Sequence, residues 1–173
     1  PDQFLIEAQA GPVYFRWMNF GPSFSSRSRT VNDIFHDQLP ISAQLGSMAV
    51  MFAMILGIPL GVIAALKQNT WLDYLGMSVA IFGVSVPAIV MGPILVWVLG
   101  VWFKVLPPSG WGAQPPYLLG FLPSDISLDY FKYALMPVVT LGMGGSALLA
   151  RLTRASLLQV IREDYIRTAR AKG

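Results

Sequence analysis

The chain has 173 residues, of which 54% are hydrophobic and only 12% are charged. Soluble domains carry charges on about 25% of their residues, so this sequence has too little polar surface to cover a water-soluble globule. Its net charge of +3 is small, and the absence of cysteine excludes disulfides and thiolate metal sites. The composition therefore predicts a protein embedded in lipid.

Residues 1–38 predict a polar segment that precedes the first membrane span. Charged residues are scattered through it, so it lacks the apolar stretch of a signal peptide. Aromatic residues surround Arg16, a composition typical of the membrane interface. Thr30 followed by Asp33 indicates a helix N-terminus, and we expect a short helix lying on the membrane surface. His36, the only histidine, has no second ligand or nucleophile nearby and is interpreted as an ordinary surface residue.

Three stretches contain no charged residue: 39–66, 74–103 and 133–150. A helix needs about 20 apolar residues to cross the hydrocarbon core of a bilayer. The first two stretches are long enough, and the third reaches this length with its flanks. The predicted fold class is therefore all-α, a polytopic transmembrane helical bundle with three spans in this chain.

The first predicted span carries a small residue at every fourth position. These residues are Ala49, Ala53, Gly57, Gly61 and Ala65. Residues four apart lie on one face of a helix, and small side chains let membrane helices approach closely. The pattern predicts a helix-packing face, which we name the small-residue ladder.

The loops between the spans predict the orientation of the chain. The tail, residues 151–173, has six basic and two acidic residues, whereas residues 1–38 and 104–132 together have five basic and six acidic residues. Basic residues concentrate on the cytoplasmic side of membrane proteins. We therefore expect the loop 67–73 and the tail to be cytoplasmic, and residues 1–38 and 104–132 to be extracytoplasmic.

The outer loop and the tail each allow two interpretations. The loop 104–132 is rich in proline and glycine, which predicts either a plain connector or a docking surface with Trp111 and Tyr117 as contacts. The tail contains no proline, and no glycine before Gly173, which favours helix. Composition alone predicts a solvated basic helix attracted to anionic lipid, and it does not decide between one bent helix and two.

The last ten residues carry a recognisable motif. They are Asp164, Tyr165, Ile166, Arg167, Thr168, Ala169, Arg170, Ala171, Lys172 and Gly173. This segment resembles the first half of the EAA-type motif, a cytoplasmic loop of ABC-transporter permeases of the peptide and nickel importer family. The general motif is Glu-Ala-Ala, three further residues and then Gly. Here Arg replaces the glutamate and Thr the first alanine; Arg at that position is usual in peptide permeases.

The resemblance extends over nearly the whole chain. Residues 19–24 resemble the segment before the corresponding span of oligopeptide permeases, and residues 61–70 resemble the loop after it. Residues 151–154 also match. Permeases of this family have about six spans, so the resemblance implies one further span before Pro1 and two after Gly173. The chain starts without an initiator Met and stops within the motif, so we expect a fragment.

The resemblance also implies a function and partners. Such a permease sits in the inner (plasma) membrane of a bacterium, pairs with a second, homologous permease and binds two cytoplasmic ATPase subunits. An extracytoplasmic binding protein delivers peptide to it. Residues 164–173 are then the ATPase-coupling element. The permease itself is expected to hold no cofactor or metal, to bind no nucleic acid and to catalyse no reaction.

Two other classes of function remain open at this level. An ion-coupled carrier or channel with a lipid-binding basic tail is the main alternative, although none of the three predicted spans contains the ionisable residue that coupling to protons usually needs. A membrane-anchored enzyme is the third, and the sequence contains no His, Asp, Glu or Ser cluster with catalytic spacing.

Overall fold

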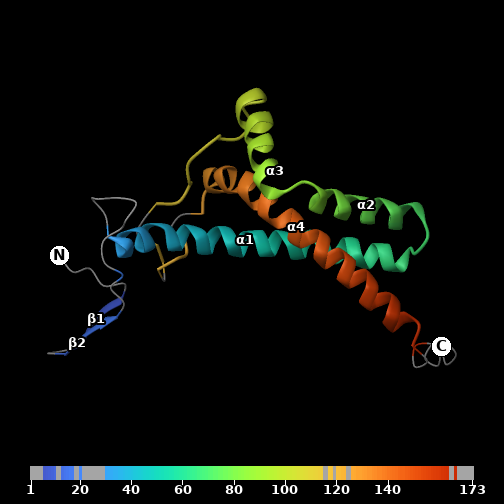
Figure 1. Ribbon diagram of the computed structural model, residues 1–173, viewed down its shortest axis with the longest axis horizontal. Helices are drawn as coiled ribbons and strands as arrows, with labels where there is room; N and C mark the ends of the chain where they lie inside the picture. Colours follow the sequence, from blue (N-terminus) through green and yellow to red (C-terminus); the bar gives the residue numbers. More distant parts are fainter. Residues whose placement is uncertain are drawn as a thin grey trace. The chain divides into compact units, whose positions relative to one another are not determined.

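The computed structural model describes residues 6–10, 13–17, 20, 30–114, 117–118, 120–123, 126–163 and 166, and helices dominate this part of the chain (Figure 1). The chain divides into two compact units. The first is Pro1–Gln44 with Ala113–Asp125, and the second is Leu45–Gly112 with Ile126–Gly173.

The first unit begins with a β-hairpin that the sequence did not predict. Strand β1 (Ile6–Ala10) pairs antiparallel with β2 (Val13–Trp17), with Ile6 opposite Trp17. β-branched and aromatic residues, which dominate β2, favour strands. The predicted helical membrane fold holds for the long elements, and the hairpin is a local addition to it.

Helix α1 (Val31–Leu66) begins where Thr30 and Asp33 predict a helix start. The Thr30 N–H donates to Asp33 Oδ2 (2.8 Å), and the Asp33 N–H donates to Thr30 Oγ1 (3.2 Å). These reciprocal bonds form a capping box. The expected separate surface helix is wrong, because α1 runs without interruption into the first apolar stretch. Its first turns have packing of their own, since Asn32 and Pro40 are buried and Asn32 Oδ1 accepts the Phe20 N–H.

The second apolar stretch forms a bent pair of helical segments in place of the single span predicted for 74–103. Helix α2 (Trp71–Ser85) is followed by α3 (Ala88–Leu95) and a π-helical segment, η1 (Val96–Trp102), and the pair bends by 96°. The break lies at Pro87, whose backbone is extended (φ −57°, ψ 139°). Proline lacks an N–H and disfavours helical geometry at the residue before it, which is consistent with a break at this position.

Helix α4 (Leu128–Ile161) is longer at both ends than the predicted span 133–150. It starts after Ser127, whose Oγ accepts the Tyr130 N–H at 3.2 Å. At its other end it includes residues 151–161 of the predicted tail, so this part of the tail is continuous with the helix before it. Pro137 lies inside α4 without ending it.

The second unit has a core of small side chains. The part of α1 that belongs to this unit, α2 and α4 lie together (Figure 1), and Ala80 of α2 clusters with Ala147 and Ala150 of α4. Many large apolar side chains point outward, with Ile89 83% exposed. Helices α1 and α4, and the bent pair if it counts as one span, are long and apolar enough to cross a membrane. The distribution is that of a protein whose solvent is lipid.

Candidate functional site

The small-residue ladder of α1 lies on a buried side of the helix. Ala49, Ala53, Gly57, Gly61 and Ala65 are all buried. A Cβ on Gly57 would lie 2.5 Å from the carbonyl oxygen of Ser146, and a Cβ on Gly61 would lie 2.6 Å from that of Ala150. Only glycine lets the backbones of α1 and α4 approach this closely.

The opposing face of α4 has a ladder of its own, which the sequence reasoning missed. Gly142, Ser146 and Ala150 are four residues apart, and all three are buried. A Cβ on Gly142 would lie 2.6 Å from a ring carbon of Phe52, and Ser146 and Ala150 are the residues that Gly57 and Gly61 approach. The same four-residue recurrence is visible in the sequence and could have revealed this face.

The next residue in that register is the partly exposed Arg154, which forms an ion pair with the buried Asp73 of α2. Arg154 Nε donates to Asp73 Oδ1 at 2.8 Å, and Arg154 Nη2 donates to Asp73 Oδ2 at 2.6 Å. Asp73 is only 2% exposed. The pair joins residues 81 positions apart, and no local pattern in the sequence indicates it.

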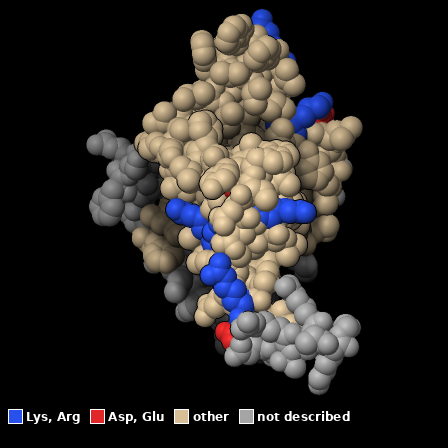
Figure 2. All heavy atoms as spheres, turned by 90° about the vertical axis from the view of Figure 1, so that its right-hand side faces the viewer, with Lys and Arg blue, Asp and Glu red and all other residues tan. Residues whose placement is uncertain are grey.

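The turn between α1 and α2 is attached to the same carboxylate. Asp73 Oδ2 also accepts the N–H of Asn69, a residue in the left-handed region with φ 60°. Arg162, just beyond α4, donates from Nη2 to Gln68 Oε1 at 3.3 Å. Basic side chains gather on the face of the molecule that this turn and the end of α4 form (Figure 2). The loop 67–73 therefore contacts the tail twice, through Asp73 and through Gln68.

The predicted coupling element lies almost entirely outside the described residues. Of its ten residues only Ile166 is described; Asp164, Tyr165, Arg167, Thr168, Ala169, Arg170, Ala171, Lys172 and Gly173 are not. The N–H of Ile166 donates to the carbonyl oxygen of Glu163 at 3.1 Å. The coupling role of residues 164–173 therefore stays a prediction.

The two aromatic residues considered as outer contacts differ in their surroundings. Trp111 is half-buried and packs edge-on against Tyr130 of α4, with ring centroids 5.6 Å apart. A Cβ on the neighbouring Gly112 would lie 2.4 Å from the Cα of Tyr130. Tyr117, in the first unit, donates from its hydroxyl to the carbonyl oxygen of Ala113 at 3.5 Å. Trp111 thus anchors the loop to α4. His36, which the sequence predicted to be an ordinary surface residue, is exposed.

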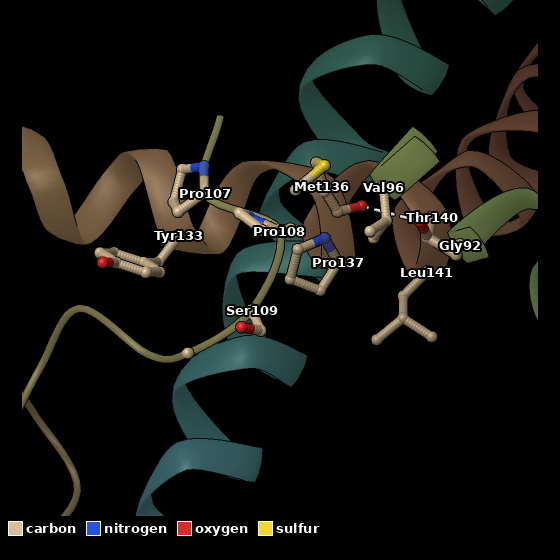
Figure 3. Close-up of a pocket in the computed structure, with 11 residues that line it drawn as sticks. Gly92, Val96, Pro107, Pro108, Ser109, Tyr133, Met136, Pro137, Thr140 and Leu141 are labelled. Atoms are coloured by element: carbon tan, nitrogen blue, oxygen red, sulfur yellow. Dashed lines mark hydrogen bonds between the residues drawn. The ribbon is translucent and has the colours of Figure 1, made fainter. Parts of the chain in front are cut away.

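An apolar cavity of about 360 Å³ lies between α3, the residues after η1 and α4. Pro107, Pro108 and Ser109 face Tyr133 and Pro137 of α4 across it (Figure 3). Its lining contains no charged residue. Among the described residues, no three His, Cys, Asp or Glu side chains are grouped so that they could hold a metal ion. The cavity can accommodate apolar groups.

Comparison with known proteins shows similarity over most of the chain. Residues 57–173 match the family described as "Binding-protein-dependent transport system inner membrane component". The chain is 42% identical to the oligopeptide transport system permease protein OppB of Salmonella typhimurium, over 90% of this chain and 46% of that protein. It is 38% identical to the dipeptide transport system permease protein DppB of Bacillus subtilis, over 90% and 45%.

A third relative extends the range of transported substrates. The glutathione transport system permease protein GsiC of Escherichia coli O1:K1 is 36% identical, over 98% of this chain and 53% of that protein. The chain spans about half the length of these curated relatives. The family match covers well over half of the chain itself. The chain therefore belongs to the family of inner-membrane components of binding-protein-dependent transport systems.

Proposed function

We propose that this chain is part of the membrane-spanning permease subunit of an ATP-driven importer of peptides. The observation that carries the proposal is the family match over residues 57–173, which includes both α4 and the motif at its end. The relatives are named for oligopeptides, dipeptides and glutathione, all of which are peptides. A peptide is therefore the substrate class that we assign.

Residues 164–173 act as the element that couples this subunit to an ATPase. The basic charge of the tail favours a cytoplasmic position, where ATP is available. Small residues such as Thr168, Ala169 and Gly173 suit a helix that enters a groove on another protein. Helix α4 ends at Ile161, shortly before this segment, so a stiff helix extends from the apolar stretch nearly to the coupling element.

The complete transporter contains further proteins. A second, homologous permease completes the translocation pathway, two ATPase subunits bind on the cytoplasmic side, and an extracytoplasmic binding protein delivers the peptide. The assembly is placed in the inner (plasma) membrane of a bacterium. ATP hydrolysis belongs to the ATPase subunits, and the permease itself catalyses no reaction.

Substitution of Gly173 in the full-length protein tests this proposal. Gly173→Arg places a long charged side chain where the motif requires a small residue, so we expect loss of ATP-dependent uptake of labelled peptide, with normal membrane insertion. Gly173→Ala is the matched control, because it adds a single methyl group, and it should retain most uptake. Normal uptake by the Arg variant, with ATPase subunits still bound, would contradict the coupling role.

A further inference from the structure

We propose that Asp73 and Arg154 form a latch that makes α2 move together with the stem of the coupling element during transport. The stem is residues 151–161 of α4, and the latch joins it to the first turn of α2. Asp73 and Arg154 are positioning residues in this proposal, because neither needs to touch peptide. The inference rests on the proposed function, since it concerns how movement of the tail reaches the membrane helices.

The geometry of the ion pair fixes the orientation of the two helices. Both carboxylate oxygens of Asp73 accept a hydrogen bond from one guanidinium, at 2.8 Å and 2.6 Å. Such a bidentate pair tolerates little rotation or sliding, because both bonds must stay aligned. The side chain of Asp73 is 4% exposed, so water has little access to the carboxylate, whereas that of Arg154 is 27% exposed.

The carboxylate also holds the turn that connects α1 to α2. Asp73 Oδ2 accepts the N–H of Asn69, and Thr70 Oγ1 donates to the carbonyl oxygen of Lys67 at 2.5 Å within the same turn. Arg162 contacts Gln68 about two helical turns beyond Arg154. One attachment within the stem and a second just beyond its end restrict the angle of the stem relative to the turn, which a single contact could not do.

Other contacts between α2 and α4 are apolar. Ala80 packs against Ala147 and Ala150, and Gly83 lies close to Met143. Small side chains permit close approach but carry no directional bond. The ion pair adds a directional contact to this packing and, in this proposal, helps to set the register of α2 against α4. The break at Pro87 separates α2 from α3, so α2 can follow the stem without carrying α3 rigidly with it.

The test measures how many peptides enter per ATP hydrolysed, using the complete transporter in proteoliposomes. Asp73→Asn and Arg154→Gln should each lower this ratio at least about fivefold, the lower end of typical coupling between sites, while ATPase subunits remain bound. The double variant should be no worse than either single variant, because one interaction is lost in all three. Arg151→Gln removes the same charge from an exposed position on the same helix and should leave the ratio unchanged.

A distance measurement on the unmodified latch gives an independent answer. The chain contains no cysteine, so spin labels can be placed at the exposed positions Ser78 of α2 and Ala155 of α4. With the latch intact, the distance between the labels should be the same without nucleotide and with ATP bound. In the Asp73→Asn variant its distribution should broaden.

The outcomes separate the latch from the proposed function. If the unaltered transporter fails to import peptide with ATP, the proposed function is wrong, whatever the variants do. If it imports peptide but Asp73→Asn keeps the same number of peptides per ATP, the latch is wrong and the function stands. A label distance that changes between the two nucleotide states of the unaltered protein would also overturn the latch.

Discussion

The close crossing of α1 and α4 makes a specific prediction about Gly57. In Gly57→Ala the new Cβ would lie 2.5 Å from the carbonyl oxygen of Ser146, whereas ordinary van der Waals contact begins at 3.4 Å. Both the oxygen and the nearby Ser146 Cα, 3.0 Å away, belong to the backbone, so no side chain can rotate to make room. The helices must separate, and this loosens the neighbouring contact at Gly61 as well.

The expected magnitude follows from two opposing terms. Overpacking a tight interface costs about 1–3 kcal/mol. Replacement of glycine by alanine in a helix gains up to about 1 kcal/mol from helix propensity. The control variants Gly46→Ala and Gly144→Ala measure the second term alone, because a Cβ at either position meets nothing within 4 Å. Relative to these controls, Gly57→Ala should lose about 1–3 kcal/mol of unfolding free energy.

Thermal unfolding of the full-length protein in detergent, followed by tryptophan fluorescence, measures this difference. A loss of 1 kcal/mol lowers Tm by about 2–4 °C in a protein of 150–250 residues, and by less in a longer chain. Gly57→Ala should therefore melt a few degrees below both control variants. If it melted at the same temperature as Gly46→Ala, the close approach of α1 and α4 at Gly57 would be wrong.

Two further predictions concern the N-terminal end of α4. Ser127→Ala removes the hydroxyl that caps α4 and should cost about 1 kcal/mol in thermal unfolding, whereas Ser156→Ala, at an exposed position of the same helix, should have little effect. An equal effect of the two would argue against the cap. Gly112→Ala would place a Cβ 2.4 Å from the Cα of Tyr130 and should detach the loop 104–132 from α4, which limited proteolysis would detect as faster cleavage within the loop. Ser109→Ala is its control, and unchanged cleavage of the Gly112 variant would contradict the anchor.

Local patterns in the sequence predicted the features that depend on neighbouring residues. Thr30 and Asp33 are three residues apart, and their side chains satisfy the first N–H groups of α1 without help from the rest of the fold. The ladder through Gly57 and Gly61 has a period that puts small residues on one helix face, and the structure places that face against α4.

Features that depend on distant residues could not be predicted in this way. The partners Asp73 and Arg154 are separated by 81 positions, and in the sequence each looks like an ordinary charge at the end of an apolar stretch. The two prolines are a second example. The helix breaks at Pro87 but α4 continues through Pro137, and the residue type alone does not distinguish the two cases. A proline interrupts a helix only where tertiary contacts do not hold the flanking residues together.

The length of α4 has a mechanical consequence. The helix contains 34 residues, and at 1.5 Å per residue it is about 51 Å long, well beyond the hydrocarbon core of about 30 Å. Its contact with Gly57 lies at Ser146, and Arg162 follows 16 residues later, which is about 24 Å along the axis. If α4 tilts together with the turn and α2 to which it is attached, about a point level with Ser146, a tilt of only ~10° displaces Arg162 by about 4 Å, nearly one helical turn. A small tilt of α4 within the membrane would therefore produce a displacement of several ångströms at its C-terminal end.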